Sequence, residues 1–148
     1  MGQETIQPRY AERGRGYKFQ DTSNNQIPKN QISNRKIFDL EARTLKFSKL
    51  VLGFLSTLPK TQNNFKLSDQ LIRSATSIGA NYIEANDSLG KKDFLMRLKV
   101  SRKEAKETIY WLHILLEVNH SSSDKIVLLI KEAQELKSIL SKIIINSR

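Results

Sequence analysis

The chain has 148 residues, a length typical of one domain, and its 25 Lys and Arg residues against 15 Asp and Glu residues give a net charge of +10. It contains no Cys, which excludes a disulfide framework, a thiolate zinc site and a cysteine nucleophile and fits a cytoplasmic setting. No apolar run approaches the roughly 20 residues of a membrane-spanning helix, so no membrane contact is expected. The charge either keeps the protein soluble or draws it to nucleic acid or an acidic partner.

Residues 1–34 differ from the rest of the sequence, and we expect a disordered basic leader there, before a domain at residues 35–148. The leader holds two of the three prolines and three of the six glycines, and it shows no helical or strand period. Such a segment cannot bury enough apolar surface to offset its conformational entropy. Arg13, Arg15 and Lys18 alternate with glycine and aromatic residues, as in flexible arms that hold nucleic acid, although a plain unstructured leader is the simpler interpretation.

Helical periodicity begins at Ile37 and stops before Pro59, and a second helix, capped by Asn63 or Asn64, fades near residues 86–88. Both helices carry apolar residues at spacings of three and four, which predicts one buried face on each. That face consists of Leu40, Thr44, Phe47, Val51, Phe54 and Leu58 in the first helix, and of Leu67, Leu71, Ala75, Ile78 and Tyr82 in the second.

A third helix is predicted from Gly90 to about Asn119, and a fourth from a serine cap before Asp124 to the last residues. The third helix has small residues in the middle of its apolar face, which allow close helix packing. The two faces consist of Phe94, Leu98, Ser101, Ala105, Thr108, Leu112 and Leu115, and of Ile126, Leu129, Ala133, Leu136, Leu140 and Ile143.

Four helices joined by short loops predict an all-α fold, an antiparallel up-down-up-down four-helix bundle. The apolar faces of the first and fourth helices are wider than the interior of such a bundle requires. We therefore expect Leu50, Phe54, Ile144 and Ile145 to remain outside the core, at a subunit interface.

No group of residues in the sequence predicts catalysis. His113 and His120 lie seven residues apart, but no pair of carboxylates stands at the Glu-x-x-His spacing of di-metal bundles: Glu117 precedes His120 by three residues, whereas Tyr110 precedes His113. A glycine-rich phosphate loop is also missing, and no sequence context activates a nucleophile. We therefore expect a protein that is not an enzyme, with no catalytic residues, no metal site and no cofactor.

Two sets of polar residues lie on single helical faces. The second helix carries a polar row, which we interpret as a structural network or subunit interface in preference to a ligand site. The third helix carries a basic row opposite its apolar face, which is either a solvated surface or a track for a phosphate backbone. The polar row is Gln70, Arg73, Ser77, Asn81 and Glu84, and the basic row is Lys92, Lys99, Arg102, Lys103 and Lys106.

The run DQLIRSATSIGANYIEA at residues 69–85, with KKDFL at 91–95 and the apolar last helix, resembles the bacterial four helix bundle protein family. That family includes the proteins encoded in intervening sequences of 23S ribosomal RNA genes and the accessory variability proteins of diversity-generating retroelements. The resemblance covers about residues 37–146. It implies a ring of protomers, typically a homopentamer, with the polar row as a family characteristic and no enzymatic activity.

In the retroelement branch, the resemblance further implies that a basic ring binds nucleic acid and a reverse transcriptase. Our leading expectation is a non-enzymatic homo-oligomer of about five chains that binds DNA or RNA through its basic surface. The second hypothesis is an accessory subunit that docks the reverse transcriptase of a diversity-generating retroelement.

Overall fold

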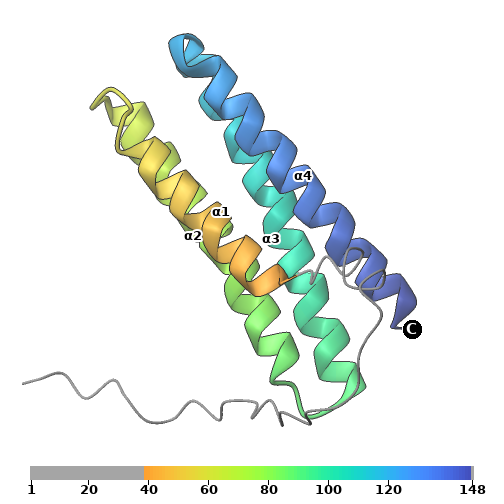
Figure 1. Ribbon diagram of the computed structural model, residues 1–148. Coiled ribbons are helices and arrows are strands. Elements are labelled where there is room, and N and C mark those ends of the chain that lie inside the picture. The colour runs from red at the N-terminus through yellow and green to blue at the C-terminus, as the bar shows by residue number, and fades with distance from the viewer. Residues whose placement is uncertain (1–38, 148) are drawn as a thin grey trace, which may run out of the picture. The chain divides into compact units, whose positions relative to one another are not determined.

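The computed structural model describes residues 39–147, which form an antiparallel bundle of four α-helices (Figure 1). The helices are α1 (Leu40–Leu55), α2 (Gln62–Asn86), α3 (Lys91–Val118) and α4 (Ser123–Asn146), and a short 3₁₀ turn, η2 (His120–Ser122), precedes α4. The part of the chain that the structure describes contains no strand. The predicted all-α up-down-up-down fold is therefore confirmed, whereas the predicted leader at residues 1–34 lies outside the described residues.

The first helix is shorter than its apolar pattern predicts. It begins at Leu40, where the Asp39 carboxylate caps it by accepting from the Ala42 amide at 3.0 Å. It ends at Leu55, before the predicted stop, because the next two residues form a turn. The hydroxyl groups of Ser56 and Thr57 each donate at 2.7 Å to a carbonyl oxygen of the last helical turn.

The cap of α2 also differs from the prediction, and the difference exposes a tertiary link. Thr61 caps the helix by accepting from the amide of Asn64 at 3.2 Å. The buried Asn64 and Asn119 side chains bind each other reciprocally, with N–O distances of 3.1 and 2.9 Å. Asn64 also donates to the carbonyl of Pro59, and Asn119 to that of Leu115. This amide pair ties the α1–α2 loop to the end of α3.

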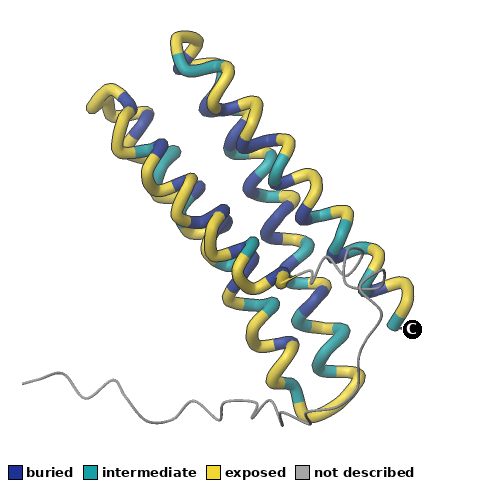
Figure 2. Tube along the Cα trace, viewed as in Figure 1, coloured by how far each residue is buried: buried dark blue, intermediate teal, exposed yellow. Residues whose placement is uncertain are grey.

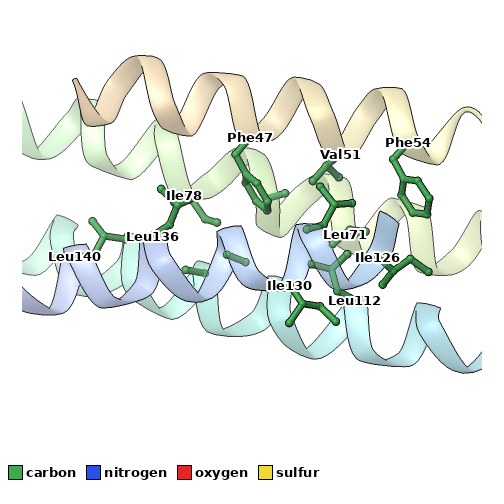
Figure 3. Close-up of a cluster of buried hydrophobic side chains, with 14 of the residues drawn as sticks. Phe47, Val51, Phe54, Leu71, Ile78, Leu112, Ile126, Ile130, Leu136 and Leu140 are labelled. Carbon is green, nitrogen blue, oxygen red and sulfur yellow. The ribbon is translucent and has the colours of Figure 1, made fainter. Parts of the chain in front are cut away.

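The predicted apolar faces form the core (Figure 3). Contrary to expectation, Phe54 and Ile144 belong to it, with only 8% and 0% of their surface exposed. Phe54 follows Phe47 by two helical turns and so shares its inward face, and Ile144 stands one turn after the core residue Leu140. Leu50, in contrast, is exposed.

Ile145 is exposed as well, so two of the four apolar residues predicted to lie outside the core do so. The outward sides of the helices are exposed and their facing sides buried (Figure 2). The packing of α2 against α3 is the most extensive in the bundle, and that of α1 against α4 is the least extensive. One side of α1 is therefore only loosely covered.

Small residues let α2 approach both α1 and α3 closely. The Ser101 hydroxyl of α3 donates to the carbonyl of Ile78 at 2.7 Å, and the Thr108 hydroxyl donates to Ser74 Oγ at 3.0 Å. These bonds confirm the close packing that the small residues in the middle of the third helix predict. They place buried hydroxyl groups in hydrogen bonds between the two helices.

Candidate nucleic-acid interface

The basic row lies on the outer face of α3. Lys92, Lys99, Lys103 and Lys106 are exposed, and Arg102 is half-buried beside them. From Lys92 to Lys106 the row rises about 21 Å along the helix axis. None of the five residues forms an ion pair with an acid in residues 39–147. The helix therefore presents a line of positive charges to solvent.

The polar row of α2 faces the neighbouring helix α3. Arg73 forms ion pairs with Glu107 and, at 3.7 Å, with Glu104, and it donates to the Gln70 side chain at 3.3 Å. Glu84 at the other end of the row pairs with Arg97 of α3. Two members of the row thus connect the two helices.

Two further members of the polar row form a hydrogen bond within their own helix. The Asn81 side chain donates to the carbonyl of Ser77 at 2.9 Å. Both residues are half-buried. This hydrogen bond leaves the side-chain oxygen of Asn81 and the hydroxyl of Ser77 available to a partner, as an interface between chains would require.

Glu107 lies at the centre of the polar contacts between α2 and α3. The Trp111 indole N–H donates to its carboxylate at 3.2 Å, and Arg73 binds the same oxygen. The hydrogen bond from Trp111, followed by that from Arg73, lowers the pKa of Glu107. A nearby Lys103 acts in the same direction. The basic row thus ends beside a carboxylate that is held in its charged form.

Glu104 is a buried carboxylate that the sequence pattern did not reveal. Only 8% of the residue is exposed, and its Oε2 atom has no hydrogen-bond partner among the described residues. The ion pair with Arg73, at 3.7 Å, compensates the buried negative charge of Glu104. Sequence spacing places Glu104 between the apolar and basic faces of α3, but only the register between α2 and α3 shows that it turns inward.

Comparison with known proteins assigns the chain to a family. The family described as 23S rRNA-intervening sequence protein matches residues 38–142. The chain belongs to this family. Both the basic row and the polar row lie inside the matched segment, so the candidate interface is part of the family's own domain.

A crystal structure at 1.70 Å resolution supports the assignment. It is described as a protein of unknown function from the S23 ribosomal protein family of Bacteroides thetaiotaomicron. It is 31% identical to the present chain, covers 71% of it and 97% of its own length, and superposes with a TM-score of 0.66. The search of curated proteins found no match.

Residues 39–147 contain no cluster of three or more His, Asp or Glu side chains placed to hold a metal ion. His113 is exposed, and His120 falls in η2, as its position after the third helix predicts. None of the described helices is long and apolar enough to cross a membrane.

Proposed function

We propose that this member of the 23S rRNA-intervening sequence protein family is a non-enzymatic homo-oligomer, a ring of about five chains, that binds nucleic acid through the outer face of α3. The observation that carries the proposal is the basic row. Its four lysines are exposed on one helical face, and no acid in residues 39–147 forms an ion pair with them. The net charge of +10 favours the same partner.

The dimensions of the basic row suit a phosphate backbone. Its length of about 21 Å corresponds to about six phosphates of one strand at roughly 3.4 Å per phosphate. Lysines contact phosphates as point charges, which carries no information about base sequence. We therefore expect binding with little sequence preference. A ring would present one row per chain, and several weak rows acting together raise the overall affinity.

Exposed apolar residues support self-association. At least 45% of the surface of several large apolar side chains is exposed to solvent, and contact with another copy of the chain would remove this apolar surface from water. Residues of this kind on α1, α2 and α4 are Leu45, Leu50, Leu52, Phe65, Ile83, Leu128 and Ile145.

Replacing the four lysines of the basic row, Lys92, Lys99, Lys103 and Lys106, by Gln tests the proposal. Gln retains helix propensity, so the bundle should keep its fold. Affinity for labelled single strands and duplexes, measured by fluorescence anisotropy, should fall more than about tenfold because phosphate contacts are lost.

The matched control replaces four exposed lysines elsewhere, Lys60, Lys66, Lys131 and Lys142, by Gln. This control removes the same charge. Its affinity for nucleic acid should stay within about threefold of that of the unaltered protein if α3 makes the phosphate contacts. An equal loss in both variants would show that only the net charge matters, and no loss in either would make the basic row a solvated surface.

A further inference from the structure

An apolar groove runs along the loosely covered side of α1. It lies between α1 and α4, has a volume of about 750 Å³, and is lined by Leu50 and Phe54 on one side and Leu128 and Leu129 on the other. Leu50 and Leu128 are 50% and 64% exposed. A Cβ atom on Gly53 would meet nothing within 4 Å, so the groove is open at its middle. We call it the α1/α4 groove.

The rim of the α1/α4 groove is basic. Lys46, Lys49 and Lys125 line it and are exposed. Its acidic residue, Glu132, is bound by Arg43 at 2.6 and 2.9 Å, so that charge is already compensated. A complementary occupant therefore needs apolar side chains flanked by carboxylates. The N-terminal segment of the chain does not fit, because residues 1–36 hold seven Lys and Arg against three Asp and Glu.

The outer face of α2 has the required chemistry. Phe65, Ile72 and Ile83 lie on one side of the helix, and small residues occupy positions 76 and 80 between them. Phe65 is 60% exposed and Ile83 47%. Asp69 and Asp87 lie on the same side, are exposed, and form no ion pair within residues 39–147. We call these five residues the α2 stripe.

The two surfaces also agree in length. The α2 stripe rises about 27 Å between Phe65 and Ile83. The α1 side of the groove extends from Arg43 to Thr57, a rise of about 21 Å if the helix geometry is continued over its last residues. The groove is therefore long enough for most of the α2 stripe, and the aspartates of the stripe then lie next to the lysines of the rim.

We infer that the α1/α4 groove of one chain receives the α2 stripe of the next chain. The inference rests on the proposed self-association and names the surfaces that carry it. Because two different surfaces meet, the contact is head-to-tail, and an open assembly keeps a free groove at one end and a free stripe at the other until it closes. Repetition of such a contact produces a ring when the rotation from one chain to the next closes.

Two variants block one surface each. The groove variant carries Leu50→Lys and Leu128→Lys, and the stripe variant carries Phe65→Lys and Ile83→Lys. All four side chains are at least 47% exposed, so circular dichroism should show an intact bundle. The control carries Met96→Lys and Val118→Lys, which adds the same charge at exposed apolar positions of α3 outside both surfaces.

Light scattering coupled to gel filtration measures the masses. Each blocked variant alone should fall to the mass of one chain, 17.0 kDa, whereas the control should keep the mass of the unaltered protein. An equimolar mixture of the two blocked variants should form a species of two chains and nothing larger, because one intact groove meets one intact stripe and the other contact stays blocked.

The outcomes separate the two claims. If the unaltered protein is a single chain, both the self-association and the inferred contact are wrong. If it assembles but a blocked variant keeps its mass, or if the control also dissociates, only the inferred contact is wrong. A third outcome is that one blocked variant stays assembled and that mixing the two variants forms no two-chain species. This outcome would indicate a two-fold contact between like surfaces, and it would also overturn the inference.

Discussion

Gly79 lies where α2 packs closely against α1. A Cβ atom at this position would stand 2.9 Å from Thr44 Oγ1 and 3.2 Å from Thr44 Cβ. Thr44 is buried and β-branched, and its hydroxyl donates to the carbonyl of Glu41 at 2.9 Å. Its side chain therefore has little freedom to move aside. The close approach of the two helices depends on the absence of a side chain at Gly79.

We predict that Gly79→Ala and Gly53→Ala change stability in opposite directions. Gly53→Ala should stabilise the bundle by about 1 kcal/mol, because Ala is the better helix former and its Cβ meets nothing. Gly79→Ala should destabilise it by about 1–2 kcal/mol, because overpacking outweighs the same gain. Urea denaturation measures both. Thr44→Ala should recover part of the loss in the Gly79→Ala background, and two equal effects would contradict the close contact.

A second residue, Glu107, makes stability depend on pH. Its pKa is lowered, first by the hydrogen bond from Trp111 and then by the bond from Arg73. A lowered pKa means that the charged form stabilises the folded state. This stabilisation is present above the pKa of Glu107 in the unfolded chain, and it is lost as the pH falls through the pKa of the folded state.

Glu107→Gln should therefore destabilise the bundle by roughly 1 kcal/mol at neutral pH, since the side chain is partly exposed and its ion pair is screened. The difference from the unaltered protein should shrink as the pH falls from 7 to about 3. Urea midpoints across this range measure it, with Glu117→Gln, an exposed position on the same helix, as the control. A difference that stays constant with pH would contradict the assigned contacts.

At the scale of elements, the Asn64–Asn119 pair joins the beginning of α2 to the end of α3. Each side chain satisfies the other in a buried setting. Asn119→Ala should cost about 1–3 kcal/mol, because it leaves a buried amide of Asn64 with one partner fewer. A double-mutant cycle with Asn64→Ala should show that the two losses are not additive.

The exposed Asn63→Ala variant is the control for this pair, and its stability should change little. Losses at Asn64 and Asn119 that add without coupling would show that the two amides act separately. The cycle requires only urea midpoints of four proteins.

The four helices were predictable from the sequence, but their tertiary contacts were not. Spacings of three and four identified the apolar faces, because a helix repeats its face at that interval. Asn64 was predicted as a cap, yet it pairs with Asn119, which is 55 residues away. The inward turn of Glu104 likewise depends on the register of α2 against α3. Local periodicity carries no information on either contact.

The same distinction applies to the candidate site. The exposed basic row follows from its placement opposite the apolar face, and the structure leaves it unpaired within the described residues. The α1/α4 groove was not predicted, because it forms where two helices distant in sequence pack loosely. Leu50 and Ile145 suggested an exposed apolar surface, but Phe54 and Ile144 face the core. The width of an apolar face in the sequence does not show which of its residues are exposed and which are buried.

The proposed function of the whole molecule depends on positive charge meeting phosphate. The most direct test is the affinity for a labelled single strand and for a duplex across a salt series. If the basic row releases counterions, log affinity should fall linearly with log salt, by about 0.7 per phosphate on single strands and 0.9 on duplex. The Gln variant of the basic row should show a shallower slope than both the unaltered protein and its matched control. Equal slopes for all three proteins would contradict the claim that α3 binds nucleic acid.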